Sequence, residues 1–217
     1  VDSTSFRVGR TVYKLPMTGL YNVSNALAAI STALLLEVHP TDIKRALLSF
    51  PGVKGRLQAI PNNRSINAYV DFAHTPNALR EVLGNLKNKL GKTEKLIVVF
   101  GSAGLRDVTK RPLMGKYAAQ FADQIIITSE DPRTEDPKDI VKDIMSGISS
   151  GARRKVVVEL DRAIAIDRAI NEFAQPGDWV VSCGKGHENS MNLDGWTETP
   201  WSDQKAMEDA LNKKNNN

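Results

Sequence analysis

Four short segments of the chain are rich in glycine and in charged or hydroxyl-bearing residues, and each follows an apolar run. They are 71–76 (DFAHTP), 101–111 (GSAGLRDVTKR), 129–133 (SEDPR) and 184–188 (GKGHE). Glycine lets a backbone approach a ligand closely, and arginine and lysine bind anions. One such segment is ordinary in a loop, but four together predict a binding site for a small charged molecule.

The segment 101–111 is the most basic of the four, with Arg106, Lys110 and Arg111 beside two glycines. This combination favours an anion. The segment matches neither the Gly-x-Gly-x-x-Gly dinucleotide fingerprint nor a Walker phosphate loop, and the complete Walker pattern occurs nowhere in the chain. The alternative is a strand-to-helix turn with solvated charges.

The segment 129–133 carries two acids and an arginine in a turn that proline stiffens. Asp131 and Arg133 could hold the ammonium and carboxylate groups of an amino acid, although a generic polar loop has the same composition. Asp71 and His74 end an otherwise apolar strand, where partial burial suits them to orient a nucleotide or a phosphoryl group. A structural histidine at a strand end is the competing interpretation.

The segment 184–188 places Gly184 and Gly186 directly behind a buried strand. The backbone can therefore approach a ligand there while Glu188 faces a cation. The alternative is a tight turn in which His187 forms only local hydrogen bonds.

Apolar strand patterns alternate with helical patterns from residue 66 onward. The predicted strands are 66–72, 95–100, 124–128, 155–160 and 178–183, and the predicted helices are 76–90, 110–122, 137–148, 162–174 and a last one from Ser202. Short apolar strands separated by helices of about a dozen residues are typical of a mainly parallel sheet covered on both faces. We therefore predict a Rossmann-like α/β domain whose polar segments lie at the carboxyl ends of the strands.

The amino-terminal part of the chain has a different pattern. Residues 5–15 look strand-like, and helices are predicted at 22–38 and 42–50, the second of which Pro51-Gly52 stops. No alternating strands accompany these helices, so this part looks like the edge of a domain whose sheet lies elsewhere. We predict domains at 1–60 and 61–217.

The composition favours a folded protein in a reducing compartment. The 217 residues are 41% hydrophobic, Cys183 is the only cysteine, and no charged-then-apolar leader is visible. The longest apolar runs, such as 26–36, are too short to span a bilayer. The net charge of +4 is not gathered into a basic stripe. We expect a cytoplasmic monomer that binds neither membranes nor nucleic acid.

Six motifs, in order, cover residues 19–188 and resemble those of the Mur ligases. They are 19–29 (GLYNVSNALAA), 52–58 (GVKGRLQ), 71–76, 104–112 (GLRDVTKRP), 128–133 (TSEDPR) and 184–188. The likeness is greatest to the members that add the third peptide residue to UDP-N-acetylmuramoyl-dipeptide. Folylpolyglutamate and cyanophycin synthetases share only the two earlier motifs. The resemblance implies that residues 1–60 end a central ATPase domain and that 61–217 form the whole carboxy-terminal, amino-acid-binding domain.

The resemblance also implies roles for particular residues. ATP would be contacted by Asn22, Asn25, Arg56, Asp71 and His74, of which Arg56 and His74 would also act in catalysis. The incoming amino acid would be held by Arg106, Lys110, Asp131, Arg133, Gly184 and Glu188. Arg133 matches the arginine that clamps a second carboxylate in the family, which favours meso-diaminopimelate over lysine. At 130–131 this chain has Glu-Asp where the family turn usually has Asp-Asn.

In such enzymes ATP phosphorylates the carboxylate of the growing peptide, and the incoming amine attacks the acyl phosphate. The resemblance thus implies ATP and Mg²⁺ as cofactors, held mostly by a central domain outside this chain, with no metal ligands within it. It implies a UDP-sugar peptide and an amino acid as partners. We expect the isolated chain to be inactive. The alternative is a non-catalytic module of the same fold that binds a ligand or partners another subunit.

Overall fold

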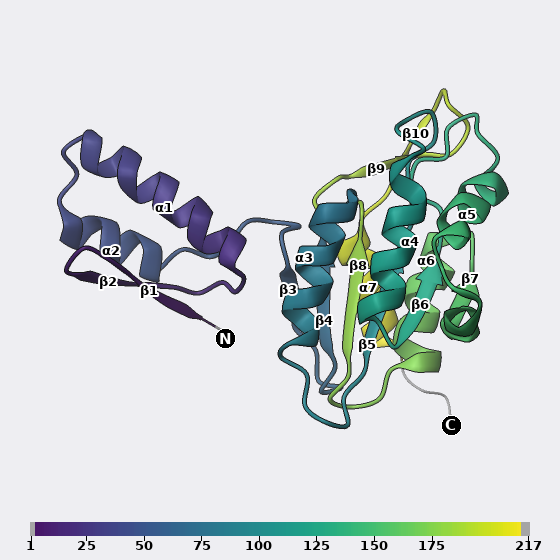
Figure 1. The fold of residues 1–217 in the computed structure, drawn as a ribbon, viewed down its shortest axis with the longest axis horizontal. Coiled ribbons are helices and arrows are strands. Elements are labelled where there is room, and N and C mark those ends of the chain that lie inside the picture. The colour runs from purple at the N-terminus through teal and green to yellow at the C-terminus, as the bar shows by residue number, and fades with distance from the viewer. Residues whose placement is uncertain (1–2, 214–217) are drawn as a thin grey trace. The chain divides into compact units, whose positions relative to one another are not determined.

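The computed structural model describes residues 3–213, which form two compact units that divide after Val53 (Figure 1). The sequence places the domain boundary after residue 60, whereas in the structure residues 54–60 belong to the second unit. The reason is that β3 (Gln58–Ile60), a strand too short to show alternation, pairs with the sheet of that unit.

The first unit is a β-hairpin with two helices. Strands β1 (Thr4–Val8) and β2 (Thr11–Leu15) pair antiparallel, and helices α1 (Leu20–Leu35) and α2 (Pro40–Leu48) follow them. Its small core contains Tyr13, Ile30 and Ile43. The expected helical remnant therefore also carries two paired strands of its own.

The second unit is built on a six-stranded sheet. Besides β3 its strands are β4 (Asn67–Asp71), β5 (Leu96–Phe100), β6 (Gln124–Ile127), β7 (Val156–Val158) and β8 (Trp179–Cys183), in the order β3-β4-β8-β5-β6-β7. All neighbours except β3 and β4 run parallel. The predicted mainly parallel α/β sheet is confirmed, and the last of its strands, β8, lies between β4 and β5.

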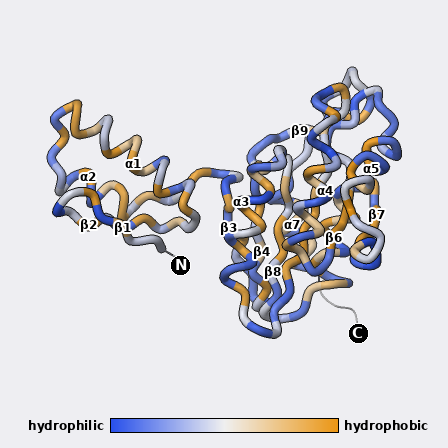
Figure 2. Tube along the Cα trace, viewed as in Figure 1, coloured by the Kyte–Doolittle hydropathy of each residue, from blue (hydrophilic) through white to orange (hydrophobic). Residues whose placement is uncertain are grey.

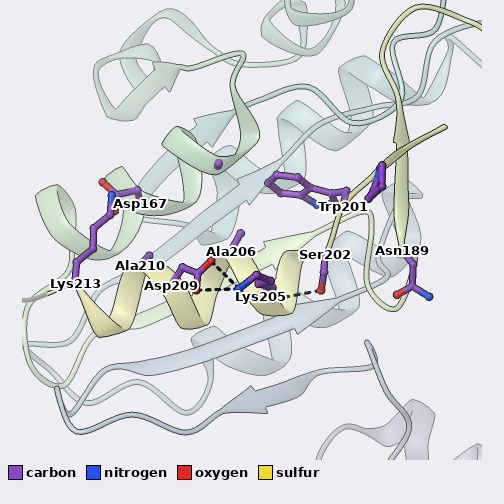
Figure 3. A pocket seen from close by; sticks show the side chains of 11 residues that line it. Asp167, Asn189, Trp201, Ser202, Lys205, Ala206, Asp209, Ala210 and Lys213 are labelled. Carbon is purple, nitrogen blue, oxygen red and sulfur yellow. Dashed lines mark hydrogen bonds and ion pairs between the residues drawn. The ribbon is translucent and has the colours of Figure 1, made fainter. Parts of the chain in front are cut away.

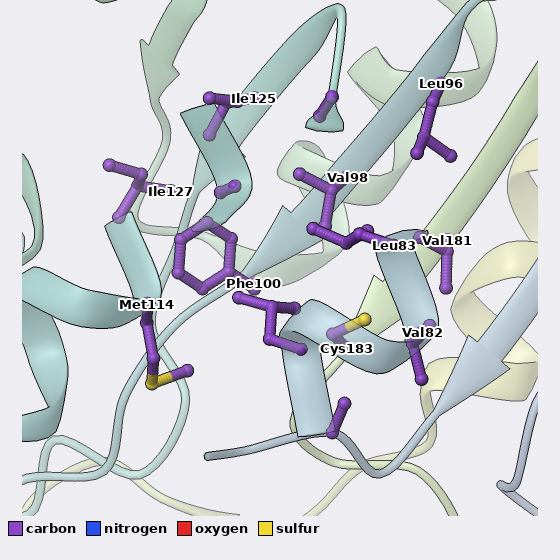
Figure 4. Packing of buried hydrophobic residues seen from close by; sticks show 14 of the residues in the cluster. Val82, Leu83, Leu96, Val98, Phe100, Met114, Ile125, Ile127, Val181 and Cys183 are labelled. Atoms are coloured by element: carbon purple, nitrogen blue, oxygen red, sulfur yellow. The ribbon is translucent and has the colours of Figure 1, made fainter. Parts of the chain in front are cut away.

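Helices cover both faces of this sheet. Helices α3 (Pro76–Lys87), α4 (Lys110–Phe121) and α5 (Pro137–Ser146) pack on one face, while α6 (Arg162–Arg168), a π-helical turn (Ala169–Phe173) and α7 (Asp203–Asn212) pack on the other. Strand side chains alternate between the two cores. Val98 and Phe100 join the first core, part of which is drawn in Figure 4, and Ile97 and Val99 join the second.

The elements outside the sheet are short. A 3₁₀ helix (Ser150–Lys155) precedes β7, and a hairpin of β9 (Ser190–Asn192) and β10 (Glu198–Pro200) follows β8. At the turn of this hairpin, Asp194 accepts hydrogen bonds from the backbone amides of Trp196 and Thr197. Figure 2 shows hydrophobic stretches within the sheet of the second unit and hydrophilic stretches in the loops that connect its elements. Within residues 3–213 no helix combines the length and apolarity needed to cross a bilayer.

Candidate functional site

The four polar segments lie at one edge of the sheet. They follow β4, β8, β5 and β6, which are consecutive neighbours in the sheet and run parallel to one another. Their carboxyl ends therefore meet at a single edge, which is where ligands bind in open parallel sheets. The expectation that these segments share an edge is confirmed by the strand order.

Backbone hydrogen bonds join neighbouring segments at this edge. The Gly184 amide donates to the carbonyl oxygen of Asp71 at 3.1 Å, and the Gly104 amide donates to that of Asp131 at 2.8 Å. The segment after β8 is thus tied to β4, and the segment after β5 to the one after β6.

Two glycines in these segments leave no room for a side chain. A Cβ atom on Gly104 would lie 2.0 Å from the Pro132 carbonyl oxygen, and one on Gly184 would lie 2.3 Å from Oε2 of Glu130. Gly184 also has a φ of +114°, which L-residues with side chains rarely adopt. The predicted role of Gly184 in close backbone approach fits this geometry, although the group that approaches it here is a protein carboxyl.

The two arginines predicted to bind the amino acid come from adjacent loops. Arg133, whose own φ is +55°, donates from Nη1 to the Gly104 carbonyl oxygen at 2.5 Å, two residues from Arg106. Arg106 is exposed and forms no salt bridge within residues 3–213. Both guanidinium groups thus belong to the paired loops after β5 and β6.

Lys185, which the sequence does not single out, lies between the two predicted acids. Its side chain is 3% exposed, and its Nζ lies 2.9 Å from Oδ1 of Asp131 and 2.7 Å from Oε2 of Glu188. The Asn192 amide also donates to Asp131. The two carboxylates and one ammonium give this trio a formal charge of −1, which is suited to attract a further ammonium group.

Of the other two cations in 101–111, only Lys110 remains at the site. It is half-buried and donates from Nζ to the His74 carbonyl oxygen at 2.8 Å. Burial lowers the pKa of Lys110, although the negative charges of Glu130 and Asp107 act to raise it. The anion-binding role suggested for Arg111 is wrong. Its side chain is fully buried and pairs with Glu135 at 2.6 Å, so it holds the loop in place.

Glu130 is the most unusual carboxyl group of the site. It is 5% exposed, its Oε2 has no hydrogen-bond partner, and burial raises its pKa to about 7 against the opposing charges of Arg162, Lys110 and Lys185. A buried, unpaired carboxyl is costly and is characteristic of functional sites. In the sequence, Glu130 stands out only as one of two acids in a proline-stiffened turn.

The buried ion pair between Arg162 and Asp203 holds the loops that follow β6 and β8. Arg162 donates to both carboxylate oxygens of Asp203 at 2.7 Å each, to the Ser129 carbonyl oxygen at 3.2 Å and to the Cys183 carbonyl oxygen at 2.9 Å. It thereby connects the ends of β6 and β8. Both charged residues are the first residues of helices, where charged side chains are usually solvated. The sequence therefore offers no reason to predict that this pair is buried.

Three of the five residues assigned to the nucleotide, Arg56, Asp71 and His74, lie around Phe72. The buried Asp71 accepts backbone hydrogen bonds from Leu57 at 2.6 Å and Ala73 at 2.8 Å, and burial raises its pKa in spite of these bonds. The exposed Arg56 lies over the Phe72 ring, and His74 donates to the Phe72 carbonyl oxygen at 2.9 Å.

Asn22 and Asn25 belong to α1 of the first unit. Asn22 is buried and donates to the Thr18 carbonyl oxygen at 2.8 Å, while Asn25 is exposed. Their predicted contact with a nucleotide stays a prediction.

A hollow of about 540 Å³ lies between α6 and α7 (Figure 3). Trp201 forms part of its wall, and two ion pairs, Asp167 with Lys213 and Lys205 with Asp209, line it. None of the predicted site residues lines it.

Comparison with known proteins identifies the family. The family model described as "Mur ligase, glutamate ligase domain" matches residues 55–186, more than half of the chain. The chain belongs to the Mur ligase family. The start of the match agrees with the division of the structure after Val53, and its end includes Gly184 and Lys185 of the site.

Two Mur ligase relatives are both named UDP-N-acetylmuramoyl-L-alanyl-D-glutamate--2,6-diaminopimelate ligase. The protein from Synechocystis sp. is 41% identical over 205 residues, and that from Lawsonia intracellularis is 40% identical over 196 residues. These alignments cover 94% and 90% of this chain but 39% of each relative. The chain therefore spans about two fifths of the length of these relatives.

Solved structures agree with the family assignment. A structure of a ligase of the same name is 37% identical, with a TM-score of 0.68 over 93% of this chain and 40% of its own. A folylpolyglutamate synthase from Mycobacterium tuberculosis, 21% identical, has a TM-score of 0.61 over 80% of this chain and 40% of its own, which shows the shared Mur ligase fold alone.

Proposed function

We propose that this chain is the carboxy-terminal part of an ATP-dependent ligase that joins meso-diaminopimelate to UDP-N-acetylmuramoyl-L-alanyl-D-glutamate. The names of the relatives support this reaction. The observation that carries it is the charge arrangement of the edge, where two arginines from paired loops adjoin an acidic trio with a net charge of −1. Such a site complements an amino acid that has one ammonium group at the trio and a carboxylate at the arginines.

In the proposed reaction, ATP supplies the phosphoryl group that activates the peptide carboxylate. The amine of the amino acid then attacks the carbonyl carbon and displaces phosphate. In this chain Asp131 and Glu188 would hold an ammonium group, and Arg106 and Arg133 would orient a carboxylate. The catalytic contribution of these residues is orientation, which turns attack between two bound reactants into an effectively intramolecular step.

Arg56, Asp71 and His74 fit the nucleotide side of this proposal. Arg56 is exposed and forms no salt bridge within the described residues, so its N–H donors are available to a phosphate group. Asp71 holds the backbone next to Arg56 through the Leu57 amide. Residues 3–213 contain no group of three or more His, Cys, Asp or Glu side chains placed to hold a metal ion.

Calorimetric titration of the chain with meso-diaminopimelate and with lysine tests the amino-acid site. We expect meso-diaminopimelate to bind more tightly, because only it has a second carboxylate for Arg133. The variant Arg133→Asn removes the guanidinium but tolerates the positive φ. A charge-assisted hydrogen bond is worth about 1.5–3 kcal/mol, so this variant should weaken diaminopimelate binding by roughly 10- to 150-fold.

Arg80→Asn is the matched control, since Arg80 is an exposed arginine on α3 that pairs with Glu81. It should leave both affinities unchanged. Equal binding of the two amino acids, or an Arg133→Asn variant that keeps its preference for diaminopimelate, would contradict the assigned pocket.

A further inference from the structure

The exposed Arg56 is attached to the fold through both of its neighbours in the chain. Gly55 is buried against the segment after β8, and a Cβ atom there would lie 2.2 Å from the His187 backbone nitrogen. On the other side, the Leu57 amide donates to Asp71, and Leu57 adopts a φ of +45°. The backbone of Arg56 is therefore held at two points, and only its side chain is free to take different positions.

The guanidinium group of Arg56 lies over the ring of Phe72. The guanidinium carbon lies 4.7 Å from the ring centroid, within the range of a cation–π interaction. The contact uses the face of an aromatic ring instead of a carboxylate, so it leaves the N–H donors of the guanidinium available for another anion.

The ring itself is held by its surroundings. Its centroid lies 4.6 Å from that of the His74 ring and 5.1 Å from that of the His187 ring. Gly186 packs directly on the Phe72 backbone, because a Cβ atom at Gly186 would lie 2.9 Å from the Phe72 Cα atom. Phe72, the residue directly after β4, is thus fixed against the segment that follows β8.

We infer that Phe72 is a positioning residue that holds the Arg56 guanidinium ready for an anionic phosphate group, with His74 and His187 fixing the plane of the ring. This inference rests on the proposed function, in which Arg56 meets the phosphate groups of ATP. Phe72 does not contact the phosphate; it acts by limiting the positions of Arg56 before the anion arrives, which lowers the entropy cost of binding.

Nuclear magnetic resonance of the ligand-free chain tests the positioning directly. A ring 4.7 Å away should shift the Arg56 side-chain resonances upfield. We expect this shift in the natural chain and in Phe72→Tyr, which keeps the ring, and its loss in Phe72→Leu. Unchanged amide resonances of β4 and β8 would show that each variant is folded. Absence of the upfield shift in the natural chain would overturn the inference.

Titration with inorganic triphosphate tests the consequence for binding. An exposed cation–π contact corresponds to about a two- to fivefold change in affinity, so Phe72→Leu should bind about two- to fivefold more weakly and Phe72→Tyr about as well as the natural chain. In an Arg56→Ala background, Phe72→Leu should have no further effect, because residues that act as one unit are not additive.

The outcomes separate this inference from the proposed function. If Arg56→Ala weakens triphosphate binding but Phe72→Leu does not, Arg56 binds the anion without help from Phe72, and only the positioning role is overturned. If Arg56→Ala leaves triphosphate binding unchanged, the assignment of Arg56 to a phosphate group is wrong, and the inference is overturned with it. If Phe72→Leu weakens binding equally with and without Arg56, Phe72 acts independently of Arg56 and the inference is likewise overturned.

Discussion

The buried carboxyl of Glu130 should make the stability of the second unit depend on pH. Burial raises its pKa from 4.5 to about 7. A carboxyl whose pKa is raised on folding favours the folded state fully below the unfolded value of 4.5, where it is protonated in both states. This favourable contribution is lost progressively as the pH rises from 4.5 to about 7, because the unfolded chain releases its proton in this range while the buried carboxyl keeps it.

The variant Glu130→Gln removes this charge while keeping the size of the side chain. One pKa unit corresponds to about 1.4 kcal/mol, so the shift predicts that the buried charge costs up to about 3 kcal/mol at pH 8. We expect the free energies of unfolding of the variant and the natural chain to be similar near pH 4.5. Between pH 4.5 and 7 the variant should become progressively more stable than the natural chain, and above pH 7 the difference should level off.

Urea unfolding followed by tryptophan fluorescence measures this difference for the relevant unit. All three tryptophans, at 179, 196 and 201, lie in the second unit. Glu135→Gln is the control, for which the expected change in the free energy of unfolding has the opposite sign. The hydrogen bond from Arg111 lowers the pKa of Glu135, so this substitution should destabilise the fold by a constant amount above pH 5 and by less as the pH falls below 4.5.

The reasoning would be refuted if the stability difference between Glu130→Gln and the natural chain stayed constant from pH 4.5 to 8. It would also be refuted if Glu130→Gln were less stable than the natural chain at pH 8, because Glu130 would then be a favourably paired carboxylate.

Two further predictions concern the groups that support the site. Asp203→Asn should lower the free energy of unfolding by about 3–5 kcal/mol in the same urea assay, since it leaves the buried guanidinium of Arg162 without its countercharge; a loss below about 1 kcal/mol would contradict the role of this pair. Gly184→Ala should lower both stability and diaminopimelate affinity, because its Cβ atom would lie 2.3 Å from Glu130 Oε2. The control Gly151→Ala should change neither, since a Cβ atom there would lie in open space. Equal effects of the two glycine substitutions would argue against the close approach at Gly184.

Most of the fold follows from local sequence patterns. The prolines at 76 and 137 mark the first residues of α3 and α5, and Thr75 and Asp136 cap these helices as their positions suggest. The continuous apolar runs of β5 and β8 predict strands buried on both faces, which they are. The strand β3 escaped prediction because three residues carry no measurable periodicity, and the predicted domain boundary was displaced with it.

The candidate site was predictable as a set of segments but not as a set of contacts. The segments stand out because glycine, proline and charged residues directly follow apolar strands. The roles of Arg111 and Lys185 were not visible, since both look like solvated loop cations in sequence although both side chains are buried. Burial depends on which distant residues pack against a side chain, and local patterns do not contain that information.

The sequence by itself determined the element types, the parallel α/β class and the four glycine- and charge-rich segments of the candidate site, because each depends on residues within a few positions of one another. Only the tertiary structure decided that β8 lies between β4 and β5, which brings the segments after these strands together. It alone decided that Lys185 pairs with Asp131 and that the Glu130 carboxyl is buried. These features arise between residues far apart in the chain, where packing and the loss of solvent, and not local conformational preference, determine the energy.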